Sequence, residues 1–390
     1  MKNKFTLGVR FQGFAGDWEQ RKLGELCDEF QSGKNIKSED VRDEGKYPVF
    51  GGNGIRGYTN TYNHDGLYAL IGRQGALCGN VNISSGKAYF SEHAIAVKGN
   101  KDNETRFLYF LLDKMNLGKY SGQSAQPGLA VNKLIELTAF IPTFAEQTKI
   151  SGFFKQLDGI IALHQQELTN LKQTKQGFLQ KMFPKEGEFV PEIRFSGFTE
   201  DWERCKLGEI VERITRKNKN LESTLPLTIS AQFGLIDQNT FFKKQVASKD
   251  ISGYYLLEKG EFAYNKSYSN DFPWGVVKRL DKYDMGVLST LYITFRPTKV
   301  NSDFLVSYYD SNKWHKEVSM RAAEGARNHG LLNISAQDFF DTELKIPKEN
   351  NEQEKIGIFF KQLDDIIALH QRKLDALKAT KKAFLQKMFA

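Results

Sequence analysis

The sequence predicts an α+β fold. Two mixed α/β modules, related by a pseudo-two-fold axis, are expected to be separated by two long antiparallel helices that form a coiled coil. Three observations predict it: a 39-residue segment without internal proline occurs twice, a shorter aromatic segment also occurs twice, and each short segment precedes a block of strand-like runs broken by glycine turns. A framework that repeats around two blocks predicts two equivalent halves.

The longer repeat predicts helices at residues 146–184 and 352–390, which are identical at 27 of 39 positions without a gap. Apolar side chains recur every seven residues in two rows, so each helix has one apolar face that it cannot bury alone. The nearest partner for each face is the other copy. The predicted seam residues are Ile150, Phe154, Leu157, Ile161, His164, Leu168 and Leu171, and Ile356, Phe360, Leu363, Ile367, His370, Leu374 and Leu377.

Two kinds of polar residue interrupt the apolar seam. We interpret His164 and His370 as residues that fix the register of the helices, because a polar residue in such a seam usually does this. Lys175 and Lys381 also lie in the rows. We expect their long side chains to extend out of the seam into water.

The shorter repeat has the pattern R-F-x-G-F-x-x-D-W and ends at Trp18 and Trp202, which we expect to be packing anchors. The predicted order is a repeat segment (1–20), a first module (21–145), the first helix (146–184), a linker and second repeat segment (185–205), a second module (206–351) and the second helix (352–390). Both modules close with Ile-Pro, and their interiors cannot be aligned by eye.

Alternating or continuous apolar runs between turn residues predict the strands of each module. In the first module these runs are 47–50, 66–71, 88–90 and 94–97, with a helix at 106–114. In the second they are 225–230, 260–264, 275–278 and 291–296, with a helix at 302–309. Both modules are thus predicted to carry strands followed by one helix, which in the first module is amphipathic.

Composition excludes several classes of protein. No apolar run approaches the 18 residues of a membrane span, and the start of the sequence lacks the apolar core of a signal peptide. The three cysteines, Cys27, Cys78 and Cys205, have no metal-binding or disulfide pattern, which is typical of a reducing cytoplasm. The net charge of +8 favours an acidic partner such as nucleic acid.

The sequence lacks a phosphate-binding Gly-x-x-x-x-Gly-Lys-Ser/Thr loop, adjacent prolines of the kind found in amino-methyltransferase loops, and a His or Cys cluster for metal. Asp338 with Glu343 and Lys345 faintly resembles a nuclease set. We prefer a simpler interpretation, a strand with an exposed charge pair.

The repeated E-Q-x-K-I-x-x-F-F-K-Q-L-D-x-I-I-A-L-H helix, the D-W-E-x-x-x-L-G-E starts and the Ile-Pro closures together resemble the specificity (S) subunit of bacterial type I restriction-modification systems. The resemblance covers nearly the whole chain. It implies that each module is a target-recognition domain that reads one half of a split DNA site, and that the helices set the spacer between the halves.

The resemblance also implies that this chain is not an enzyme and holds no cofactor. S-adenosylmethionine, ATP and Mg would belong to partner subunits: two modification (methyltransferase) subunits and two restriction (motor and nuclease) subunits. Double-stranded DNA is the expected ligand, and a cytoplasmic location without membrane contact is expected.

Reading bases requires Arg, Lys, Asn or Gln side chains on loops that reach the major groove. The candidates in the first module are Asn53, Arg56, Tyr58, Arg73, Gln74, Ser121, Gln123 and Gln126. Those in the second are Asn265, Lys266, Tyr268, Asn270, Arg321, Arg327, Asn328 and His329. Two alternatives remain open: a self-contained nuclease, and a coiled-coil scaffold whose modules bind protein or sugar.

Overall fold

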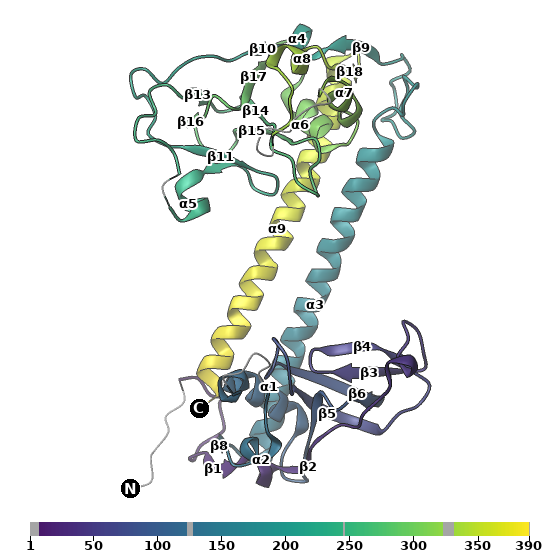
Figure 1. The fold of residues 1–390 in the computed structure, drawn as a ribbon, viewed down its shortest axis with the longest axis vertical. Coiled ribbons are helices and arrows are strands. Elements are labelled where there is room, and N and C mark those ends of the chain that lie inside the picture. Colours follow the sequence, from purple (N-terminus) through teal and green to yellow (C-terminus); the bar gives the residue numbers. More distant parts are fainter. Residues whose placement is uncertain (1–7, 123–127, 245, 323–330, 390) are drawn as a thin grey trace. The chain divides into compact units, whose positions relative to one another are not determined.

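The structure is a computed structural model that describes residues 8–122, 128–244, 246–322 and 331–389. The chain divides into two compact units. Unit 1 comprises Met1–Gln166 and Arg372–Ala390, and unit 2 comprises Glu167–Gln371. The two long helices, α3 (Phe144–Lys181) and α9 (Asn350–Met388), each contribute one part to both units (Figure 1, teal and yellow). The predicted α+β class with two long helices is confirmed.

The two long helices pack antiparallel within each unit. In unit 1 the early residue Phe153 of α3 contacts the late residue Phe384 of α9, with ring centroids 5.1 Å apart. In unit 2 the late Phe178 of α3 contacts the early Phe359 of α9 at 5.0 Å. These are the same repeat positions with the helices exchanged, as two equivalent antiparallel helices require. Each predicted seam residue is buried or half-buried.

The two lysines of the seam do not extend into water, so that prediction is wrong. The Lys175 side chain is 12% exposed and its ammonium lies 2.6 Å from an oxygen of Asp364. The Lys381 side chain is 19% exposed and lies 2.7 Å from Asp158. Each lysine is held by an aspartate of the opposite helix, which keeps the charged group inside the structure.

Unit 1 is built on a six-stranded sheet in the order β2-β7-β5-β6-β3-β4, in which only the β3–β6 pair is parallel. The strands are β2 (Cys27–Ser32), β3 (Tyr47–Gly51), β4 (Gly54–Thr59), β5 (His64–Gly72), β6 (Val81–Phe90) and β7 (Ala94–Gly99). The helices are η1 (Leu23–Leu26), η2 (Ser38–Asp40), α1 (Thr105–Met115), η3 (Leu117–Tyr120) and α2 (Val131–Leu134). A separate antiparallel pair joins β1 (Glu19–Lys22) to β8 (Thr138–Ile141).

Unit 2 contains a four-stranded antiparallel sheet in the order β10-β17-β14-β15. These strands are β10 (Val211–Arg213), β14 (Phe262–Asn265), β15 (Val276–Arg279) and β17 (Ile293–Pro297). Three further pairs join β9 (Glu203–Lys206) to β18 (Glu343–Ile346), β11 (Leu227–Ser230) to β12 (Gly234–Asp237), and β13 (Tyr255–Glu258) to β16 (Met285–Leu288). The helices are α4 (Leu207–Ile210), α5 (Gln238–Phe242), α6 (Ser302–Asp310), α7 (His315–Arg321) and α8 (Ala336–Phe340).

The two modules share one sheet although their sequences do not align. Strand order β2-β7-β5-β6 in unit 1 corresponds to β10-β17-β14-β15 in unit 2, and a helix follows the last strand in both. We call these four strands the shared sheet. The units differ in what the chain forms between the first two strands of the shared sheet in sequence order. Between β2 and β5 of unit 1 lies the β3–β4 hairpin, and between β10 and β14 of unit 2 lie β11, β12, α5 and β13. The predicted strands and helices all lie within or overlap observed elements.

The repeated short motif is explained by a buried ion pair. Arg10 donates two hydrogen bonds to Glu146 at the start of α3, both 2.7 Å long, and a third to the Gly16 carbonyl. Arg194 binds Glu352 of α9 and the Glu200 carbonyl in the same way. The two glutamate side chains are only 1% and 2% exposed. The arginine of each repeat segment therefore fixes that segment to the helix that follows its module.

The glutamine after each of these glutamates joins three parts of the module. Gln147 donates to the Pro142 carbonyl at 3.0 Å and accepts from the Glu104 amide at the start of α1. Gln353 does the same with Pro347 and with the Asn301 amide before α6. The E-Q and Ile-Pro motifs thus belong to one joint. Trp18 and Trp202 are buried in the cores of the two units, as predicted.

No helix in the part of the chain that the structure describes is long and apolar enough to cross a membrane.

The buried Arg194–Glu352 ion pair gives the first prediction. Arg194→Met should lower the free energy of unfolding of unit 2 by about 3 kcal/mol, because it leaves a buried carboxylate without its partner. Urea titration followed by circular dichroism measures the change. Arg296→Met is the control, since the Arg296–Glu212 pair is on the surface and its loss should change stability much less. Equal losses in both variants would contradict the assigned role of Arg194.

Candidate nucleic-acid interface

In both units, candidate residues follow directly after the same strand of the shared sheet. Strand β5 leads to Arg73 and Gln74, and β14 leads to Lys266. The Arg73 carbonyl accepts a hydrogen bond from the Leu129 amide, and the Lys266 carbonyl accepts one from the Leu332 amide, both at 2.9 Å. Arg73 and Lys266 therefore occupy equivalent places, which only the strand pairing reveals.

Three turns meet at this place in unit 1. The Arg73 amide donates to the His93 carbonyl, which lies in the turn between β6 and β7. Gln74 Oε1 lies 3.1 Å from His93 Nδ1. The turn between β3 and β4 packs on both, since a Cβ on Gly52 would lie 3.2 Å from the His93 carbonyl oxygen and 3.3 Å from that of Gln74. The polar side chains of the three turns are thus gathered at one edge of the sheet.

Glycine permits this approach. A Cβ on Gly72 would lie 2.2 Å from the Gly52 carbonyl oxygen, which no side chain tolerates. Gly54 closes the β3–β4 turn with φ +95°, a conformation that favours glycine. Glycine is therefore required at position 72 by the contact between the end of β5 and this turn, and it is favoured at position 54 by the turn itself.

Four of the eight candidates of unit 1 lie at this edge of the sheet, and two others lie elsewhere among the described residues. Asn53, Arg56 and Gln74 are exposed, and Arg73 is half-buried beside them. Tyr58 lies at the other end of the β3–β4 hairpin, where its backbone pairs with Arg42. The Ser121 hydroxyl donates to the Gly118 carbonyl at 2.7 Å, so it caps a turn. Gln123 and Gln126 lie outside the described residues.

The candidates of unit 2 are also divided. Asn265 accepts from the Ser267 amide, and the Lys266 ammonium donates to the Ile334 carbonyl. Asn270 is exposed and Tyr268 is half-buried in the loop that follows β14. Arg321 forms an ion pair with Glu317 within α7. Arg327, Asn328 and His329 lie outside the described residues.

One residue at this edge was missed by the sequence reasoning. His93 lies between the predicted strands 88–90 and 94–97, in a turn with polar neighbours, so the criterion used for the other candidates would have found it. The contact with Gln74 could not be predicted, because the two residues belong to different turns.

The residues of the faint nuclease set have other partners. Asp338 accepts hydrogen bonds from Ser335 and caps the start of α8. Glu343 lies 3.3 Å from Arg204 on the paired strand β9. The Lys345 ammonium donates to the carbonyls of Lys185 and Glu188. Glu343 and Lys345 lie on strand β18, as the preferred interpretation expects, but they do not form an exposed charge pair, because both are half-buried and each binds another residue.

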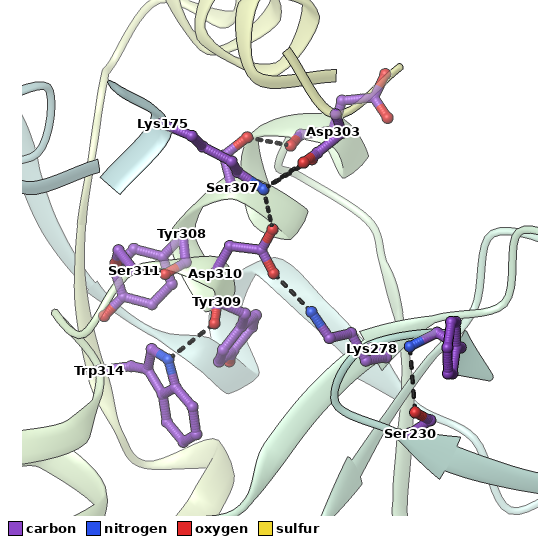
Figure 2. A network of polar contacts seen from close by, with 12 residues as sticks. Lys175, Ser230, Lys278, Asp303, Ser307, Tyr308, Tyr309, Asp310, Ser311 and Trp314 are labelled. Atoms are coloured by element: carbon purple, nitrogen blue, oxygen red, sulfur yellow. Dashed lines mark hydrogen bonds and ion pairs between the residues drawn. The ribbon is translucent and has the colours of Figure 1, made fainter. Parts of the chain in front are cut away.

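Unit 2 also contains a chain of charged side chains in contact, which we call the ion chain (Figure 2). Lys278 of β15 and Lys175 of α3 each lie 2.7 Å from an oxygen of Asp310 at the end of α6. Lys175 also contacts Asp364 of α9. Burial by itself would raise the pKa of Asp310, but the two ammonium groups outweigh it and lower the pKa to about 2.

A family model described as the type I restriction modification DNA specificity domain matches residues 15–173 and 199–379. The EcoprrI specificity subunit of a type I restriction enzyme from Escherichia coli is 41% identical over 144 residues, which are 36% of this chain and 36% of that protein. The putative type I restriction enzyme specificity subunit S.HindORF215P of Haemophilus influenzae is 30% identical over 167 residues, or 42% of each chain. The chain thus matches less than half of the length of these two relatives.

The fold is similar to the crystal structure of a type I restriction-modification system S subunit from M. genitalium. The TM-score is 0.69 at 17% identity, and the superposition covers 99% of each chain. At this identity the likeness is one of fold.

The pKa of Asp310 generates the second prediction. Because it lies below the ordinary value of 3.8, the carboxylate contributes about 2 kcal/mol of stability above pH 5, and the contribution is lost as the pH falls towards 2. The difference in free energy of unfolding between the wild type and Asp310→Asn should therefore shrink over this range. Asp284→Asn, which removes an exposed carboxylate, should show a much smaller pH-dependent difference. A constant difference for Asp310→Asn would contradict the assignment.

Proposed function

Because the chain belongs to the family of type I restriction modification DNA specificity domains, we propose that it is the DNA sequence-specificity subunit of a type I restriction-modification complex. Each module reads one half of a bipartite target. One observation carries the proposal: both units have the same shared sheet, with glycine-rich or polar loops of different sequence at the end of the equivalent strand. A common frame with different loops suits the reading of two different half-sites.

The long helices set the spacer in this proposal. A helix of 38 residues is about 57 Å long. One turn of DNA is about 34–36 Å, so half-sites one to two turns apart suit such a helix. The basic side chains of the chain, which carries a net charge of +8, add affinity for phosphates that does not depend on sequence.

In this proposal the chain positions its partner subunits and catalyses no reaction itself. Methylation of adenine with S-adenosylmethionine belongs to two modification subunits, and ATP- and Mg-dependent translocation and cleavage belong to two restriction subunits. The described residues support this division, since the nuclease-like carboxylates cap a helix or pair with arginine. Burial raises the pKa of the Cys27 and Cys205 thiols to about 12, so both remain protonated and are poor nucleophiles.

The outer faces of the long helices provide the docking surface for the modification subunits. Ile160 and Leu163 of α3 are 44% and 66% exposed, and their repeat equivalents in α9, Ile366 and Leu369, are 42% and 43% exposed. Apolar residues at the same positions of both copies face water. Two equivalent apolar surfaces fit two copies of one partner.

Exchange of modules tests the reading of half-sites. Replacing residues 206–351 with the second module of another S subunit should change one half of the methylated target and leave the other half and the spacer unchanged. Sequencing of methylated adenines in the genome of a host that carries the exchanged chain measures all three. A change in both halves would contradict independent modules, and cleavage of DNA by the purified chain with magnesium would contradict the absence of catalysis.

Charge on the helix surface tests the docking. Leu163→Glu and Leu369→Glu should each weaken binding of the modification subunit by at least about tenfold, since a buried leucine contributes about 1.5–3 kcal/mol. Titration calorimetry with the purified modification subunit measures the affinity. Gln165→Glu introduces the same charge about 200° around the same helix and should leave the affinity nearly unchanged. Equal loss in all three variants would show that the effect is not local.

A further inference from the structure

The ion chain links the recognition hairpin of unit 2 to the helix pair. Strands β14 and β15 form this hairpin, with Ala263 opposite Lys278. The loop 266–275 at its tip contains three of the candidate base-reading residues, Lys266, Tyr268 and Asn270. From Lys278 the contacts pass through Asp310 and Lys175 to Asp364, at 2.7, 2.7 and 2.6 Å. Figure 2 shows Lys278 and Lys175 on opposite sides of the Asp310 carboxylate.

Three members of this chain recur in unit 1, and the fourth does not. Lys381, Asp158 and Asp113 occupy the places of Lys175, Asp364 and Asp310. The strand register equates Tyr264 with Ile71. Tyr264 lies opposite Ile293 of β17, and Ile71 lies opposite Ile95, the equivalent residue of β7. The residue opposite Leu70 is Asn82, where unit 2 has Lys278 opposite Ala263. The hairpin of unit 1 thus has a neutral side chain where the hairpin of unit 2 has the cation.

Lys278 lowers the pKa of Asp310 and so contributes to stability at neutral pH, but a buried ion pair is a weak source of net stability. Removing charges from water is costly, and replacing a buried ion pair with apolar side chains is often neutral or even stabilising. What such a pair provides is a defined geometry. The Lys278 side chain is 24% exposed and Asp310 is 16% exposed, so the contact is shielded from water.

We propose that Lys278 and Lys175 are positioning residues for the second half of the target. They hold the β14–β15 hairpin, and with it the loop 266–275, at a fixed place relative to the helix pair, while the first module reads its half-site without this link. The inference rests on the proposed function.

The experiment measures binding of the wild-type and variant chains, each assembled with its modification subunits, to three DNA duplexes. One duplex has both half-sites, one has the first half scrambled and one has the second half scrambled. Lys278→Gln and Lys175→Gln should reduce the preference for an intact second half by about tenfold, which is on the order of one lost base contact. The preference for an intact first half should stay the same. Lys278→Arg, which keeps the charge, should restore most of the loss.

Arg279→Gln is the matched control. Arg279 lies on the same strand and binds Asp303 of the same helix at 2.7 Å. Its other contacts among the described residues are with Asp281, Ser302 and the Phe262 ring, none of which belongs to α3. This variant should leave the second-half preference unchanged. An equal loss with Arg279→Gln, or equal losses at both half-sites with Lys278→Gln, would overturn the proposal because general damage to the hairpin would explain them.

If Lys278→Gln fails to fold, Asp364→Asn removes the outer end of the ion chain at a residue whose side chain is 44% exposed. It should reduce the second-half preference in the same direction and by a smaller factor, and no change would overturn the proposal. A wild-type chain without preference for either half-site would refute the proposed function itself. A wild-type chain with both preferences, together with unchanged variants, would refute only the positioning role.

Discussion

The structure depends on the burial of the apolar face of each long helix. A helix of this length with one apolar face is unstable alone in water, so each copy needs a partner of matching pattern. Because the copies are equivalent and antiparallel, the Phe153–Phe384 contact of unit 1 has its counterpart in the Phe359–Phe178 contact of unit 2. Phe183, two residues after α3, lies in the core of unit 2, and Phe389, directly after α9, lies in the core of unit 1. The core of each unit is therefore completed by the helix that follows the other module.

Polar joints convert this pairing into a defined frame. Arg10 and Arg194 tie each repeat segment to a helix start, and Gln147 and Gln353 tie that start to the Ile-Pro turn and to α1 or α6. Buried charged and amide groups that each find their partners leave few alternative arrangements. The frame is the same in both units, which allows the loops at the ends of β5 and β14 to differ without loss of the fold.

The two units differ in the charged contacts that they form at the ion chain. Both units place a lysine of one long helix against an aspartate of the other. In unit 2, Asp310 and Lys278 extend this contact to the hairpin. In unit 1, Lys381 is the only cation among the described residues that lowers the pKa of the equivalent Asp113, and burial, the largest influence, outweighs it and raises that pKa. Equivalent positions in the two units thus hold carboxylates with opposite pKa shifts. The charged form is stabilised in Asp310 and destabilised in Asp113.

The sequence by itself determined the two long helices, their seam, the repeated module starts and the main strands, because heptad spacing and glycine turns are local signals. It also determined the family. Only the tertiary structure decided which candidates lie together: Arg73 and Lys266 became equivalent through hydrogen bonds to Leu129 and Leu332. Lys175, expected in water, instead binds two aspartates from different elements. The physical reason is that the fate of a charged side chain is set by partners distant in sequence, which no local pattern records.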